Sequence, residues 1–206
     1  MTGTAVTAVR VGRRYAASRR IPAAVVAIVI CAAGLRIALI HHWDAYGALQ
    51  LPLAFETTAA AAIAVTTTSP FGEPERVTGR WLPLLRLAAT VALTAVAIAA
   101  LAAGGAGGHL AGGTLAVLRN VAGITGIGLL GAVVLGGRLS WAGPVGYLLP
   151  AAYALYTRWH NAALTTPWLW PGRPPRDLGG ALCAGLVFAA GLALVSWRGA
   201  RDPVGE

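Results

Sequence analysis

Three charged side chains lie within long apolar runs of this sequence, namely Arg36, Glu56 and Arg119. A single unpaired charge in the hydrocarbon core of a membrane costs at least about 2.5 kcal/mol on insertion scales. If these runs cross a membrane, pairing Glu56 with one or both arginines is the least costly arrangement. We therefore predict an intramembrane polar cluster of these three residues, which either lines a substrate path or joins the helices structurally.

Histidine side chains offer a second kind of chemistry, because imidazole is a common metal ligand. The chain has four histidines, His41, His42, His109 and His160, and Asp44 closely follows the first two. Their spacing resembles no known zinc-ligand motif. We predict that they are ordinary residues of the membrane interface and that the chain holds no metal.

Motifs for catalysis are absent from the sequence. It contains neither GxSxG nor HExxH, and Glu56 has no second carboxylate near it at membrane depth. All 16 basic residues are arginine, so the chain also lacks the lysine of a nucleotide-binding P-loop. Thr66, Thr67, Thr68 and Ser69 are expected to hydrogen-bond the backbone at a helix end rather than act as nucleophiles. We predict that the chain has no catalytic residue and is not an enzyme.

The composition indicates the environment in which these residues lie. Of 206 residues 57% are hydrophobic and only 11% are charged, whereas about 25% are charged in a soluble domain. The chain is therefore expected to be an integral membrane protein. Its net charge of +9 could suit nucleic acid, but the arginines flank apolar runs, as the positive-inside rule describes, so we expect no nucleic-acid partner.

Apolar runs of about 20 residues are long enough to cross a bilayer as helices. Six such runs divide the region 21–206, at 21–40, 48–68, 82–103, 114–136, 141–156 and 179–197. An even number of spans places both termini on one side. Eleven arginines lie on that side and three in the opposite loops, so both termini are predicted to be cytoplasmic. The fold class is an all-α integral membrane protein with six transmembrane helices.

Residues 1–20 carry five arginines, of which Arg10, Arg13 and Arg14 follow helical spacing. This pattern predicts a basic amphipathic helix lying on the lipid of the inner leaflet; a disordered basic anchor is the alternative. At the other end of the chain, the tryptophans and prolines of 157–178 indicate an outer segment that lies at the interface or dips into the membrane.

Small residues within two of the runs predict close contact between helices, because they let helix backbones approach each other. These residues are Gly123, Gly126, Gly128 and Gly131 in the fourth run, and Gly180 and Ala184 in the sixth.

The loop 69–81, SPFGEPERVTGRW, separates the second and third apolar runs. Pro70, Gly72 and Pro74 end the preceding helix, since proline lacks an N–H and glycine adopts conformations that other residues avoid. Four charged residues return this loop to water: Glu73, Glu75, Arg76 and Arg80. A short charged loop on the cytoplasmic side is a place where a soluble partner could act on the membrane helices.

This layout resembles the ABC-2-type exporter permeases, the membrane subunits of the ABCG-like architecture. The resemblance implies that Glu73, Glu75, Arg76 and Arg80 lie in a coupling element that docks on a separate ABC ATPase. ATP and Mg would bind to that ATPase, with no cofactor on this chain. It further implies a dimer with a second permease copy or paralogue in a bacterial plasma membrane, and the absence of lysine fits an actinobacterial source.

The function expected from this resemblance is that of a permease subunit that moves a hydrophobic or amphipathic compound by alternating access. A non-transporting membrane scaffold, or an immunity, sensor or accessory subunit, is the main alternative. A membrane enzyme and a metal or haem carrier are the remaining ones.

Overall fold

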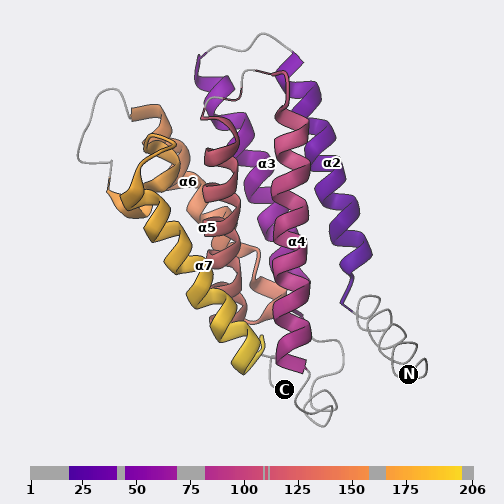
Figure 1. Ribbon diagram of the computed structural model, residues 1–206. Coiled ribbons are helices and arrows are strands. Elements are labelled where there is room, and N and C mark those ends of the chain that lie inside the picture. The colour runs from indigo at the N-terminus through magenta and orange to yellow at the C-terminus, as the bar shows by residue number, and fades with distance from the viewer. Residues whose placement is uncertain are drawn as a thin grey trace, which may run out of the picture.

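The computed structural model describes residues 19–40, 45–68, 82–108, 110, 112–157 and 166–200, and in these ranges all regular secondary structure is helical. Figure 1 shows a bundle of long helices. They are α2 (Ile21–Ile40), α3 (Ala45–Val65), α4 (Leu82–Gly105), α5 (Gly113–Val134), α6 (Ala142–Thr157) and α7 (Leu178–Arg198), with short 3-10 helices η2 (Gly137–Leu139) and η4 (Pro167–Gly172).

Four of these helices, α2, α4, α5 and α7, are long and apolar enough to cross a membrane, which is consistent with a multi-pass membrane protein. At 1.5 Å per residue, 20 residues span about 30 Å, the thickness of the hydrocarbon core. The described apolar part of α3, Gln50–Val65, and the 16 residues of α6 are shorter. All six predicted helices are present, but crossing of the membrane by α3 and α6 stays a prediction.

The helices run alternately up and down the bundle (Figure 1). At one end, Arg19 before α2 donates a hydrogen bond of 2.7 Å to the carbonyl oxygen of Thr67 after α3. At the same end, the guanidinium of Arg86 in α4 lies against Gly199, which follows α7. At the opposite end, Leu39 of α2 lies against Gly108, which follows α4. The starts of α2 and α4 therefore lie beside the ends of α3 and α7.

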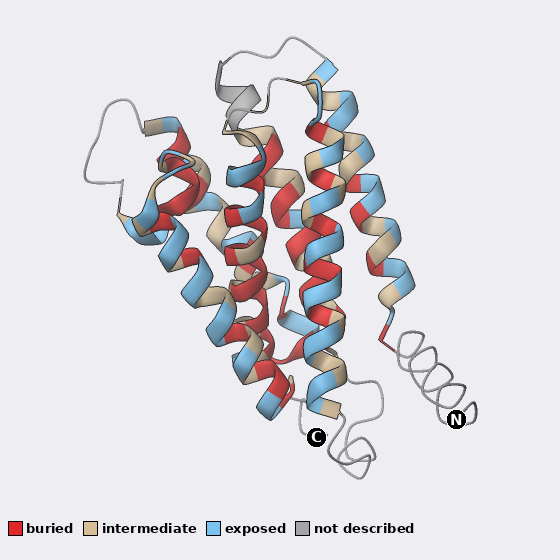
Figure 2. Cartoon of the chain, in the orientation of Figure 1, coloured by how far each residue is buried: buried red, intermediate tan, exposed pale blue. Residues whose placement is uncertain are grey.

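Helix α5 is the central helix of the bundle. In its most apolar stretch 61% of the residues are buried, against 22–28% in α2, α4 and α7. Figure 2 shows the same contrast, with buried residues along α5 and exposed ones on the outer faces of α2 and α7. Exposed residues such as Ile30 and Leu186 are large and apolar, as expected of faces that contact lipid.

The predicted small-residue contacts of α5 are formed within the chain. A Cβ on Gly126 would lie 2.6 Å from the backbone of Phe188 in α7. A Cβ on Gly128 would lie 2.6 Å from the Cβ of Ala64 in α3. Glycine therefore lets α3 and α7 approach α5 more closely than any other residue would allow.

The described part of the outer segment packs Trp170 of η4 into the bundle. Its side chain is 2% exposed and stacks on Tyr147 of α6 with ring centroids 4.9 Å apart. Gly123 of α5 provides the space, because a Cβ there would lie 2.6 Å from the indole. Trp168 of the same short helix stays 52% exposed.

Candidate functional site

A cavity of about 230 Å³ lies between α3, α5, α6 and the connection from η4 to α7. Its polar wall is formed by Glu56 of α3, Arg119 and Asn120 of α5, and Arg173 after η4. The apolar wall includes Leu53, Val117, Leu155 and the prolines Pro52, Pro171 and Pro175. The cavity thus combines one carboxylate, one amide and two guanidinium groups with apolar side chains.

Glu56 is held by an amide rather than by an arginine. Asn120 Nδ2 donates a hydrogen bond of 2.9 Å to Glu56 Oε2, and both side chains are buried. This bond joins α3 to α5. Neither Arg36 nor Arg119 forms a hydrogen-bonded ion pair with Glu56 among the described residues, and each arginine donates to backbone carbonyls instead.

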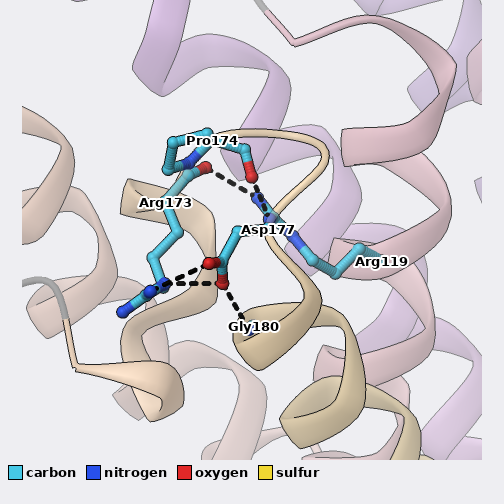
Figure 3. A network of polar contacts seen from close by, with 5 residues as sticks. All are labelled: Arg119, Arg173, Pro174, Asp177 and Gly180. Atoms are coloured by element: carbon cyan, nitrogen blue, oxygen red, sulfur yellow. Dashed lines mark hydrogen bonds and ion pairs between the residues drawn. The ribbon is translucent and has the colours of Figure 1, made fainter.

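Arg119 lines the same cavity as Glu56 but points its guanidinium at the backbone (Figure 3). Nη1 donates to the carbonyl oxygen of Pro174 at 2.7 Å, and Nη2 donates to that of Arg173 at 3.1 Å. A guanidinium presents several N–H donors in a fixed plane, so one side chain can satisfy both carbonyls. Arg119 therefore ties the connection between η4 and α7 to the central helix.

A second contact fixes the connection from the other side (Figure 3). Arg173 Nε and Nη2 donate to the two carboxylate oxygens of Asp177 at 2.6 and 2.9 Å. Asp177 also caps α7 by accepting a hydrogen bond from the Gly180 N–H. The Arg173 guanidinium, and next the Gly180 N–H, hold the pKa of the Asp177 carboxyl below its ordinary value.

Arg36 lies apart from this cavity. Its Nη1 donates to the carbonyl oxygen of Ala106, just after α4 ends. A cation near the unsatisfied carbonyls at a helix C-terminus is favourable. The structure thus places Glu56 and Arg119 on one cavity, while Arg36 joins α2 to α4.

The other predicted residues divide into two groups. Gly123, Gly126 and Gly128 line helix contacts, Gly131 approaches Ser140, and Gly180 and Ala184 pack near Trp170. The coupling residues Glu73, Glu75, Arg76 and Arg80 lie outside the described residues, as do residues 1–18, Asp44 and the four histidines. No cluster of three metal-ligating side chains occurs in the ranges that the structure describes.

The threonines at the end of α3 bond the backbone, as predicted. The hydroxyls of Thr66, Thr67 and Thr68 donate to the carbonyl oxygens of Ile63, Ala64 and Val65 at 2.6, 2.6 and 2.7 Å. The same carbonyls accept the backbone N–H groups of these threonines, so each hydroxyl adds a second hydrogen bond at the end of the helix.

Sequence reasoning missed Asn120 as the partner of Glu56. An amide beside an arginine in an apolar run was a usable signal, because a buried amide needs a polar partner. Two features of the sequence indicate the Arg173–Asp177 contact. The two residues have opposite charges and lie four positions apart. The aspartate also stands just before an apolar run, where the N-cap of a helix is expected. Chemically, the site offers a carboxylate that can accept a hydrogen bond, a proton or a cation.

Comparison with known proteins adds no family to this description. The chain matches no family model, no curated protein and no solved structure.

Proposed function

We propose that this chain is the permease subunit of an ATP-driven ABC exporter for a hydrophobic or amphipathic compound. In this role helices α2 to α7 all cross a bacterial plasma membrane, with both termini in the cytoplasm. The loop 69–81 receives force from a separate ATPase, which binds ATP and Mg. Two such chains, identical or paralogous, form the transport unit.

The observation that carries this proposal is that α3, which contributes Glu56 to the cavity wall, leads directly into the loop 69–81. Thr67 and Thr68, the last described residues before the loop, contact Arg19 and Gly137 respectively. Glu56 in α3 precedes Thr68 by 12 residues, which corresponds to about 18 Å along a helix axis. A push on the loop would move α3 as a rigid element and change the wall of the cavity.

A membrane scaffold, immunity or accessory subunit is the second candidate. The close packing of Gly126 against α7 and of Gly128 against α3 favours it, because helices packed this closely resist the relative movement that alternating access requires.

Charge reversal in the loop distinguishes the two functions. We expect Glu75→Arg together with Arg76→Glu to reduce ATP hydrolysis by the purified assembly and to leave the permease chain folded in the membrane. Reversal of Arg201→Glu in the C-terminal tail serves as the matched control and should change little. Equal ATP hydrolysis in the loop variant and the control would count against coupling through 69–81.

A further inference from the structure

Two buried residues in the cavity wall have polar atoms without a hydrogen-bond partner in the described part of the protein. These atoms are Nε of Arg119 and Oδ1 of Asn120, and the two residues are 4% and 7% exposed. Glu56 lines the same cavity, and its Oε1 accepts no hydrogen bond from the described residues. Because a buried polar atom without a partner is costly, a molecule that supplies partners in the cavity would bind favourably.

The charges around the cavity compensate one another. Arg119 keeps its positive charge while it donates to backbone carbonyls, and it attracts the carboxylate of Glu56. Arg173, the second guanidinium of the wall, pairs with Asp177, with 2.6 Å between Nε and Oδ2. A charged molecule would therefore lose its hydration in the cavity without meeting a counter-charge that lacks compensation. This balance favours an uncharged ligand.

The atoms without partners indicate which uncharged group fits. Asn120 donates to Glu56 through Nδ2, so its Oδ1 is an acceptor, as is the Oε1 of Glu56. The Nε–H of Arg119 is a donor. The group that complements two acceptors and one donor is a primary amide, which has two N–H donors and a carbonyl acceptor.

We propose that this cavity binds an uncharged primary amide with a compact hydrocarbon body. The amide N–H groups donate to Glu56 and Asn120, and its carbonyl oxygen accepts from Arg119. The hydrocarbon body packs against the apolar part of the wall, which includes Leu53, Val117 and Leu155. The cavity volume of about 230 Å³ is sufficient, since an apolar cavity of about 150 Å³ holds benzene. The site lies within one chain and needs no ATPase, so its test is separate from that of the exporter function.

Benzamide is a suitable probe, with benzylammonium and benzoate as charged counterparts of similar size. Equilibrium dialysis at pH 7 would use the full chain in phosphatidylcholine nanodiscs, with binding to empty nanodiscs subtracted. We expect one benzamide to bind per chain, and each charged counterpart to bind at least about tenfold more weakly because its charge must be desolvated. Benzamide binding no greater than to empty nanodiscs would show that the cavity holds only water and would overturn the proposal. Tighter binding of either charged probe would overturn it as well.

Glu56→Gln tests the charge balance of the wall. The variant leaves the charge of Arg119 without its compensating carboxylate, so benzoate should bind about tenfold more tightly than to wild type. Benzylammonium should not gain affinity. Benzamide should still bind, because the glutamine oxygen can accept its hydrogen bond. Loss of benzamide binding together with unchanged benzoate binding would contradict the proposal.

A second pair of variants tests the cavity without altering its charge. Ala116→Leu fills the cavity from α5, whereas Ala181→Leu makes the same change on an exposed face of α7. Only the first should abolish benzamide binding, and this comparison decides the matter if Glu56→Gln does not fold. Equal benzamide binding by wild type and Ala116→Leu would place the ligand elsewhere and overturn the proposal.

Discussion

Arg119 Nη1 donates a hydrogen bond of 2.7 Å to the carbonyl oxygen of Pro174, which lies 55 residues further along the chain. Through this bond and its neighbour to Arg173, a charge in the central helix holds the irregular connection before α7. Irregular backbone at membrane depth is tolerated where protein satisfies its carbonyls. The arginine therefore has a structural task that its sequence position alone does not indicate.

Substitution of Arg119 should destabilise the bundle through these two carbonyls. We expect Arg119→Met to lower the free energy of unfolding by about 0.5–1.5 kcal/mol for each of the two part-buried hydrogen bonds that it removes. Arg119→Lys keeps the charge but lacks the planar fork, so it should recover only part of the loss. Thermal unfolding in detergent micelles measures both variants, and wild-type stability of Arg119→Lys would show that charge alone is sufficient.

The glycine contacts predict a contrast between two identical substitutions. Gly126→Ala would place a Cβ 2.6 Å from the backbone of Phe188, whereas Gly185→Ala in α7 meets nothing within 4 Å. Overpacking costs about 1–3 kcal/mol, so the first variant should unfold at a lower temperature. The second should be neutral or slightly more stable, because alanine favours helix over glycine by up to about 1 kcal/mol. Equal melting temperatures would contradict the close approach of α5 and α7.

Trp170 provides a test of the packed outer segment. Trp170→Ala removes a side chain that is 2% exposed, and should cost about 3–5 kcal/mol of unfolding free energy. Trp197 is 85% exposed, so Trp197→Ala is the matched control and should change stability by less than about 0.5 kcal/mol. Chemical unfolding followed by near-ultraviolet circular dichroism compares them, and similar losses in both variants would argue against the burial of Trp170.

The Asp177 contacts predict a dependence of stability on pH. The folded state lowers the pKa of this carboxyl, chiefly through Arg173, so its stabilising effect is complete above the ordinary aspartate pKa of about 3.9. That effect is lost as the pH falls through the lowered folded-state value. Asp177→Asn keeps an N-cap oxygen but loses the ion pair.

Melting temperatures of wild type and Asp177→Asn should therefore differ above pH 5 and converge as the pH falls below about 3.9. A difference that stays constant over this range would show that the charge of Asp177 does not contribute.

The helices could be predicted from the sequence because the length of an apolar run determines them. The run 21–40 coincides with α2, and the predicted 82–103 became Leu82–Gly105. Capping explains the end of α7 as well, since Gly199 adopts a φ of +75° that favours glycine.

The polar partners could not be predicted in the same way. Glu56, Arg36 and Arg119 are all charged, so pairing them was the simplest arrangement, yet Asn120 reaches Glu56 and both arginines bond carbonyls. The rotation of each helix about its own axis determines which donor reaches which acceptor. A run that is apolar on all sides does not indicate this rotation. For the same reason spacing did not separate buried Trp170 from exposed Trp168.

The most direct test of the proposed function is to purify the tagged chain from its native membrane, identify its partners by mass spectrometry and assay ATP hydrolysis. We predict a stoichiometric ABC ATPase subunit that is lost when Glu75 and Arg76 are reversed in charge. A clean preparation without any ATPase would contradict the exporter function and favour a membrane scaffold.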